Sequence, residues 1–232
     1  MNIVLITAGA RWEMLKQSIT SIINNAADWS KHELIVSTDC WTPDTQQLDW
    51  ITRYCGRFII NRKLGASAAR NIGAASIPKY KRQEYVCFFD DDVYCCPEWD
   101  SQLEGVLNAP QYQPWRGVSG HAHPYNHTVL GRCSGGLMTN VLSTVNIACP
   151  WSMWDDVGWF TEPGGPGGSE DVDWSARATK KAYGLAVTVP QCVIHTGVTS
   201  SSGKPIVGAD LVMENNHKLE KIHGVEGKVI YT

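Results

Sequence analysis

The alternation of short apolar runs with helix-like segments between Asn2 and Phe89 constrains the fold of this chain more than any other feature. Buried strands are predicted over Asn2–Thr7, Leu34–Ser37, Phe58–Ile60 and Tyr85–Phe89. Helices are predicted between them, over Trp12–Ala27, Pro43–Cys55 and Ala66–Ala75. Strands that alternate with helices favour right-handed crossovers and a largely parallel sheet. The sequence therefore predicts an α/β fold with a Rossmann-like central sheet flanked by helices.

The chain beyond Phe89 is patterned less regularly. Strands are predicted over Gly117–His123, Ser143–Ile147, Leu185–Val189 and Val193–Ile194. Helices are predicted over Pro150–Val157 and from an N-cap at Ser169 to about Tyr183, with Gly184 as the C-cap. The Gly/Pro-rich stretch 162–168 between them predicts a loop, and the tail from Pro205 a helix near Ala209–Lys221 and a strand near Lys228–Tyr231. Since no linker stands out, we expect one domain with two lobes over residues 1–232.

Composition and charge exclude several classes of protein. The net charge of −3 gives no general attraction to nucleic acid or to anionic membranes. No segment approaches the roughly 20 apolar residues of a membrane span, and the first residues lack the basic leader of a signal peptide. The eight cysteines show no CxxC spacing, so we expect them to be reduced and mostly buried in a cytoplasmic protein.

Three adjacent acids, Asp90, Asp91 and Asp92, directly follow the predicted strand Tyr85–Phe89. Adjacent carboxylates repel one another, so a cation is expected among them, and hard oxygen ligands suit Mg²⁺ or Mn²⁺. The competing interpretation is an acidic turn. The position after a buried strand favours the metal, because ligands in parallel sheets bind beyond the carboxyl ends of the strands.

Three further features carry possible chemistry. Small residues from Gly65 to Gly73 surround Arg70, which could pair with a phosphate or could lie on a tightly packed Ala/Gly helix. Glu170 and Asp171 begin a predicted helix, where the dipole favours ionised acids and also lowers their basicity. Asp173 and Arg177 have the spacing of a structural surface ion pair. His195 follows a predicted strand, whereas His121, His123 and His127 indicate a polar loop.

In this order, these features resemble the GT-A-fold glycosyltransferases, and glycosyltransferase family 2 in particular, from residue 2 to about residue 197. The resemblance rests on Asp39, the Ala69-Arg70-Asn71-x-Gly73 segment, Phe89-Asp90-Asp91-Asp92-Val93, Gly158-Trp-Phe-Thr-Glu162, Glu170-Asp171 and His195. It implies a nucleotide-sugar-binding half at 1–95, a less regular metal, acceptor and catalytic half at 96–204, and a tail at 205–232.

The resemblance also implies a role for each matched residue. Thr7, Ala8, Arg11, Asp39, Gly65, Arg70, Asp90 and Asp91 would bind the donor, with Asp39 on the base and Asp90 near the ribose. Asp92, His195 and Asp90 would form the metal site for Mn²⁺ or Mg²⁺. Asp171 would be the catalytic base, and Glu170 would bind a sugar. By alternation along an extended chain, Asp91 is expected to point away from its two neighbours.

The implied activity is metal-dependent, inverting transfer of one hexose or pentose from a nucleotide-sugar, a UDP-sugar by family habit. Single transfer is expected because the Gln-x-x-Arg-Trp motif of processive synthases is absent. Two alternatives stay open: a nucleotidyltransferase of similar fold and a non-catalytic nucleotide-sugar-binding module. The acceptor is open too: a glycan, a protein, a small molecule or a hydroxymethylated base in DNA.

Overall fold

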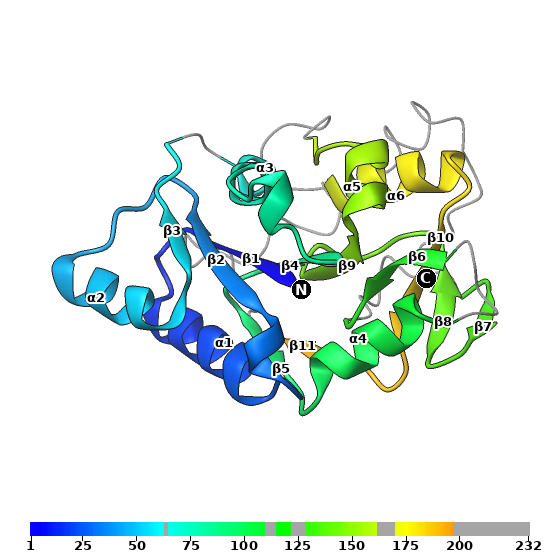
Figure 1. Ribbon diagram of the computed structural model, residues 1–232, viewed down its shortest axis with the longest axis horizontal. Helices are drawn as coiled ribbons and strands as arrows, with labels where there is room; N and C mark the ends of the chain where they lie inside the picture. The colour runs from blue at the N-terminus through cyan, green and yellow to red at the C-terminus, as the bar shows by residue number, and fades with distance from the viewer. Residues whose placement is uncertain (63–64, 110–114, 122–128, 162–169, 197–232) are drawn as a thin grey trace, which may run out of the picture.

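The computed structural model of the chain describes residues 1–62, 65–109, 115–121, 129–161 and 170–196. Several expectations lie outside these residues: the loop after Thr161 up to the N-cap Ser169, the imidazoles of His123 and His127, and the helix and strand of the tail. Figure 1 shows a central sheet with helices on both of its faces.

The strands form one large sheet and one small one. They are β1 (Asn2–Thr7), β2 (Glu33–Thr38), β3 (Arg57–Ile59), β4 (Tyr85–Phe89), β5 (Val93–Cys95), β6 (Trp115–Ser119), β7 (Gly131–Cys133), β8 (Gly136–Thr139), β9 (Asn146–Pro150), β10 (Gly184–Thr188) and β11 (Val193–His195). The large sheet has the order β3-β2-β1-β4-β9-β6-β10-β8-β7, and β11 pairs with β5 separately. Within the large sheet, all strands except β9 and β8 run in the same direction. The predicted α/β fold with a mainly parallel sheet is confirmed.

Helices cover the two faces of the large sheet. They are α1 (Trp12–Asn24), α2 (Thr45–Tyr54), α3 (Ala66–Ala75), α4 (Trp99–Leu107), α5 (Trp151–Val157) and α6 (Glu170–Lys180), with 3₁₀ turns at Trp29–Lys31 and Lys79–Lys81. In Figure 1, α3, α5 and α6 lie on one face and α1 and α4 on the other.

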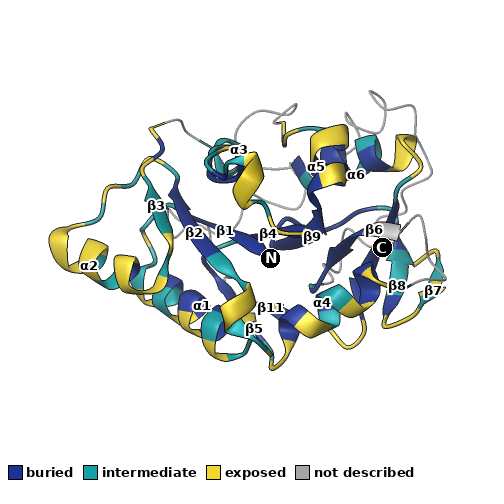
Figure 2. Cartoon of the chain, in the orientation of Figure 1, coloured by how far each residue is buried: buried dark blue, intermediate teal, exposed yellow. Residues whose placement is uncertain are grey.

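The buried core follows from the two-residue period of the strands. In β1, Ile3 and Leu5 pack with α1 and α4, whereas Val4 and Ile6 pack with α3, α5 and α6. Because both faces are covered, the central strands carry continuous apolar runs, such as Ile3–Ile6 in β1, rather than alternating apolar and polar residues. Figure 2 shows these strands buried and the outer sides of the helices exposed.

Helix α3 packs against β1 more closely than an ordinary helix could. A Cβ added at Gly73 would lie 2.4 Å from Cγ1 of Val4 and 3.2 Å from Cβ of Ser37. The small residues of this segment therefore serve helix–sheet packing, as the structural interpretation of the Ala/Gly pattern expected. Arg70 on the same helix is nevertheless buried, not on the surface.

Several element boundaries differ from the sequence prediction. α1 ends at Asn24, and α2 starts after Asp44, whose side chain forms a capping box with Gln47. β9 starts at Asn146 and ends at Pro150, three residues later than predicted at each end. The C-cap prediction at Gly184 was wrong: that residue begins β10, and the left-handed conformation falls on Ala182, with φ 63°.

Four elements were not predicted: β5, α4, β7 and β8. α4 follows Glu98, which has φ 59° and makes no side-chain cap, so the sequence carries no N-cap signal there. Its apolar spacing at Trp99, Leu103, Val106 and Leu107 is helical and could have revealed it. β5 and β7 have three residues each and β8 four, which is too short for a clear period.

Candidate active site

A cavity of about 200 Å³ lies at the carboxyl ends of β1, β2 and β4. The chain leaves β1 toward β2 on one side, and β4 joins β1 on the other side, so the cavity sits where the strand order reverses. Ligands of doubly wound sheets bind at this kind of position. Its lining includes eight residues predicted for the site: Thr7, Ala8, Arg11, Asp39, Arg70, Asp90, Asp91 and Glu170.

The loop after β1 shapes one wall of the cavity. Gly9 adopts φ +72°, and a Cβ there would lie 2.0 Å from the ring of Trp41, so a larger residue does not fit. Thr7 Oγ1 accepts from Gly9 N at 2.9 Å and donates to Oδ2 of Asp91 at 2.6 Å. This turn places Arg11 immediately before α1, facing the acids after β4.

Arg11 joins two of the three adjacent acids. Its Nη2 donates to Oδ1 of Asp91 at 2.6 Å, and its Nη1 donates to Oδ2 of Asp92. Asp91 therefore does not point away from Asp92, and that expectation was wrong. The physical reason is that the chain leaves the extended conformation after Phe89 and turns at Asp91 and Asp92.

Asp92 is also joined to His195 at the end of β11. The distance between Nε2 of His195 and Oδ2 of Asp92 is 3.1 Å. The pairing of β11 with β5 brings the histidine to this position, with His195 opposite Val93. Oδ1 of Asp92 is buried and makes no hydrogen bond.

Arg70 holds the third acid and the start of α6 together. Its guanidinium donates to Oδ1 of Asp90 through Nη2 and to Oε1 of Glu170 through Nη1 at 3.0 Å. The side chain is 1% exposed and lies 5.7 Å from the ring centroid of Phe160. Thr144 Oγ1 donates to the same oxygen of Glu170 at 3.2 Å. Arg70 is thus a buried clamp between β4 and α6.

Asp39 and Gly65 meet at the start of α3. Asp39 accepts from the backbone N of Gly65 at 2.9 Å, and its own backbone N donates to Thr7 O at 2.7 Å. Asp39 therefore ties the ends of β1 and β2 to α3 at the edge of the cavity, and Gly65 lies beside the lining residue Ala66.

The carboxyl groups of the site differ in acidity. Burial, with the charges of nearby acids, raises the pKa of Asp90 to about 6 against the effect of Arg70. Burial and the charge of Glu170 raise the pKa of Asp171 to about 7. The backbone N–H groups at the helix start lower this pKa, as expected, but desolvation and the charge of the adjacent acid outweigh them.

The contact between Asp92 and His195 favours the charged form of both groups. Burial works to raise the pKa of Asp92, but the hydrogen bond and charge of His195 and the charge of Arg11 hold it below its usual value. The hydrogen bond to Asp92 raises the pKa of His195. The carboxylate of Asp92 is therefore ionised over the pH range in which Asp90 and Asp171 take up protons.

The chain supplies its own cations to the adjacent acids. Arg11 compensates Asp91 and Asp92, and Arg70 compensates Asp90. Repulsion among the three carboxylates is therefore not enough, on its own, to require a metal ion. Within the described parts of the chain, no cluster of three or more His, Cys, Asp or Glu side chains forms a metal site.

A cation that binds together with a diphosphate needs fewer protein ligands. Mg²⁺ and Mn²⁺ accept one or two side chains from the protein and complete their shell with phosphate oxygens and water. Oδ1 of Asp92 is a buried acceptor without a partner, and the imidazole of His195 contacts the other oxygen, Oδ2, of the same carboxylate. These two residues fit such an ion, whereas Asp90 is engaged by Arg70.

Other residues near the site have structural roles. Asp173 and Arg177 form the predicted ion pair at 2.8 Å, although Asp173 is buried, and Arg177 also donates to Val157 O and Trp159 O. The ring of His121 packs 5.9 Å from that of His195.

Sequence reasoning missed the residues that position the site. Thr144 supports Glu170, and Ser18 of α1 donates to the backbone oxygens of Asp91 and Val93 at 2.9 and 2.8 Å. Thr196 donates to Asp92 O through both its backbone N and its hydroxyl. Isolated hydroxyl residues give no pattern along a sequence, so only the fold reveals them.

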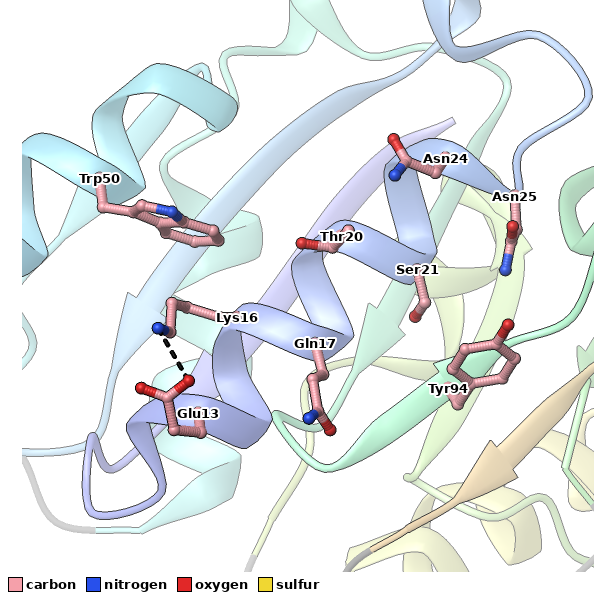
Figure 3. A pocket seen from close by; sticks show the side chains of 9 residues that line it. All are labelled: Glu13, Lys16, Gln17, Thr20, Ser21, Asn24, Asn25, Trp50 and Tyr94. Carbon is pink, nitrogen blue, oxygen red and sulfur yellow. Dashed lines mark ion pairs between the residues drawn. The ribbon is translucent and has the colours of Figure 1, made fainter.

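A larger depression of about 510 Å³ runs along the outer side of α1. Figure 3 shows Trp50 and Tyr94 on either side of the helix, with Lys16 paired to Glu13 at 2.8 Å. None of the predicted site residues lines it. The smaller cavity, where acids and arginines converge, is therefore the candidate active site.

None of the helices in the described part of the chain has the length and apolarity that a bilayer span requires. No curated protein sequence matches the chain. The model of glycosyl transferase family 2 matches residues 3–130.

Solved structures share the fold at low sequence identity. GalNAc-T7, crystallised with UDP, GalNAc and Mn²⁺, is similar with a TM-score of 0.71 and 13% identity over 96% of this chain and 48% of that one. Residues 1–349 of S. aureus TarS in complex with UDP-GlcNAc give a TM-score of 0.66 and 15% identity over 97% of this chain and 66% of that one. This chain therefore spans less than two thirds of each. These likenesses establish the GT-A type of the fold.

Proposed function

Because the chain belongs to glycosyl transferase family 2, we propose that it transfers one sugar from a nucleotide-sugar to an acceptor hydroxyl. The observation that carries the proposal is that eight of the expected site residues line one cavity, and that Asp92 and Asp171 directly follow two of them in the chain. The lining residues come from five separate segments of the sequence: the end of β1 with the loop after it, Asp39 after β2, α3, the acids after β4, and the start of α6.

The proposed donor is a UDP-sugar. In support, TarS residues 1–349 were crystallised with UDP-GlcNAc and GalNAc-T7 with UDP. The loop Thr7–Arg11 and Asp39 would hold the nucleoside, and Arg11 the diphosphate. The cavity is smaller than the roughly 300–1,000 Å³ of typical ligand pockets. It would therefore take part of the donor, and the rest would extend along the acids after β4.

The proposed cofactor is Mn²⁺ or Mg²⁺, held by Asp92 and His195. The ion supplies charge stabilisation for the departing nucleoside diphosphate when it is bound. Asp90 would contact the ribose rather than the ion, because Arg70 fixes its carboxylate. The buried Arg70 keeps Asp90 and Glu170 in place without moving, which is the preorganisation that charge-stabilising sites need.

Asp171 is the proposed general base. With a pKa raised to about 7, its carboxylate is basic enough to take a proton from an acceptor hydroxyl near neutral pH. The hydroxyl oxygen would form a bond to the anomeric carbon while the bond to the diphosphate oxygen breaks on the opposite face. This displacement inverts the anomeric configuration. Glu170, fixed by Arg70 and Thr144, would accept a hydrogen bond from a sugar hydroxyl.

The acceptor is proposed only as a hydroxyl group on a glycan, a protein, a small molecule or a hydroxymethylated DNA base. The absence of a Gln-x-x-Arg-Trp motif supports the transfer of a single sugar in each encounter.

The proposal is tested by following product release from UDP-sugars with a panel of acceptors and Mn²⁺. The expected product is UDP, and release of pyrophosphate from nucleoside triphosphates would instead identify a nucleotidyltransferase. D171N should reduce UDP release by at least about 10²-fold, as expected for a lost general base. D173N, two residues along the same helix, should retain the rate per folded molecule. Full activity of D171N would refute the assignment of the base.

A further inference from the structure

The guanidinium of Arg11 is bound to the carboxylate of Asp92, which is the group that would hold a metal ion. The guanidinium bridges Oδ1 of Asp91 and Oδ2 of Asp92, and its side chain is 20% exposed. Oδ2 of Asp92 is shared by Arg11 and His195, whereas Oδ1 has no hydrogen bond. One oxygen of this carboxylate is thus bound twice and the other not at all.

A change of protonation cannot release Asp92 from this contact. Arginine keeps its charge at any pH at which the protein is folded. A divalent ion at the unbound Oδ1 of Asp92 would be repelled by a guanidinium that stays on Oδ2 of the same carboxylate. Binding of the ion and the Asp92 contact of Arg11 therefore oppose each other.

Asp91 provides a point on which Arg11 can turn. Its Oδ2 is held by Thr7 and its backbone oxygen by Ser18, so the carboxylate stays fixed while the contact to Asp92 breaks. Nη2 of Arg11 can keep its bond to Asp91, and Nη1 becomes available to the cavity that Arg11 lines. A diphosphate in this cavity would accept a hydrogen bond from Nη1.

We propose that Arg11 is an exchangeable counter-ion: it neutralises Asp92 in the empty site and passes to the diphosphate when a divalent ion binds Asp92. This inference rests on the proposed function for the identity of the diphosphate. Metal ion alone then binds weakly, because Arg11 must give up its contact with Asp92 before a diphosphate is present to receive it. Metal ion and UDP bind together with positive coupling, because each removes the obstacle to the other.

The test is Mn²⁺ binding to the full chain, measured by electron paramagnetic resonance with and without UDP. R11Q, which removes the competing charge, should bind Mn²⁺ without UDP on the order of tenfold more tightly than the native chain. In the same variant, UDP should improve Mn²⁺ affinity by a smaller factor than in the native chain. R11K keeps a positive charge without the planar fork of arginine, so its Mn²⁺ affinity should lie between those of R11Q and the native chain.

K16Q is the matched control. It removes one positive charge from the helix that directly follows Arg11, but Lys16 pairs with Glu13 on the outer side of α1 and lines none of the site. Its Mn²⁺ affinity should equal that of the native chain, and circular dichroism of each variant establishes that it is folded.

Two outcomes would overturn the inference: Mn²⁺ affinity in R11Q that is equal to or weaker than in the native chain, or an equal gain in K16Q. Coupled binding of UDP and Mn²⁺ to the native chain tests the proposed function separately. Coupling that persists unchanged in R11Q would refute the role of Arg11 and leave the donor assignment intact.

Discussion

At the scale of single residues, the site is a set of acids whose charges the chain itself partly compensates. Five carboxyl groups, of Asp90, Asp91, Asp92, Glu170 and Asp171, face two guanidinium groups and one imidazole. Burial, together with the charges of neighbouring acids, raises the pKa values of Asp90 and Asp171, while the contacts of Asp92 keep it ionised. Residues of one chemical type are thereby given different tasks by their surroundings.

The raised pKa of Asp171 predicts the pH dependence of the reaction. A general base acts only when ionised, so kcat/KM should rise with pH through about 7 and level off above it. Asp90, with a pKa of about 6, should steepen the loss of activity at lower pH. The measurement is kcat/KM for UDP release between pH 5 and 9. A profile that is flat across pH 7 would contradict the assignment.

The raised pKa of Asp171 also predicts how the stability of the fold depends on pH. The folded pKa of Asp171 lies above its ordinary value of 3.8, so between about pH 4 and pH 7 the folded state holds a proton that the unfolded state releases. Stability contributed by this group therefore falls as pH rises through that window.

D171N removes this dependence. We expect the variant to be more stable than the native chain by about 1–3 kcal/mol at pH 8, and by little at pH 4. Thermal denaturation at the two pH values measures the difference. D49N, an exposed acid on α2, serves as the control and should match the native chain. A D171N variant that is less stable at pH 8 would show that Asp171 is not held in an unfavourable environment.

The buried position of Arg70 predicts that its planar fork matters, and not only its charge. R70K keeps a positive charge but cannot bridge Asp90 and Glu170 in the same way. We expect kcat/KM to fall by about 10²-fold and stability by about 1–3 kcal/mol. R53K, at an exposed position on α2, should change neither by much. Equal effects in the two variants would argue against the clamp.

At the scale of elements, the site depends on how closely α3 and the loop after β1 approach the sheet. The missing Cβ of Gly73 lets α3 lie on β1, and α3 carries Arg70 to the carboxyl end of β4. Crowding at this contact would displace Arg70 together with α3.

G73A tests this contact. The added methyl group would lie 2.4 Å from Val4, so we expect a loss of about 1–3 kcal/mol, typical of overpacking. G105A on α4 is the matched control, because no heavy atom lies within 4 Å of its added Cβ. Alanine there should stabilise the helix by up to about 1 kcal/mol. Chemical denaturation of both variants measures the two changes, and a stable G73A would mean that α3 is not held so closely.

Elements with a long, clear pattern could be predicted from the sequence. β1, α3 and β4 have the predicted bounds, because buried strands and an Ala/Gly helix are marked over their whole length. The short strand β5 and its pairing with β11 could not be predicted, although they bring His195 to Asp92. The family resemblance identified His195 from the sequence, but its contact with Asp92 is seen only in the fold.

The candidate site, too, could be predicted only in part. The acids, Arg70 and Arg11 were found from their positions after strands or in a motif. The contacts among them were not, because the turn at Asp91 and Asp92 depends on Ser18 and Thr196, which come from distant segments. Local alternation therefore gave the wrong direction for Asp91.

At the scale of the whole molecule, the two halves of the chain meet in one sheet. β9 inserts between β4 and β6, so strands from before and after the acids are hydrogen bonded into a continuous layer. The adjacent acids lie at the end of β4, beside this junction, and α6 brings Glu170 and Asp171 from the later half. Both parts of the chain therefore line one cavity, to which the later part contributes Glu170.

The most direct measurement for the central claim is a thermal-shift screen of nucleotide-sugars with and without Mn²⁺. A UDP-sugar at 100 times its Kd should stabilise the chain by about 2.7 kcal/mol, which raises Tm by several degrees. We expect this shift with a UDP-sugar and Mn²⁺, a smaller one without the ion, and loss of the Mn²⁺-dependent part in D92N. Absence of any shift with every nucleotide tested, in the presence of Mn²⁺, would contradict it.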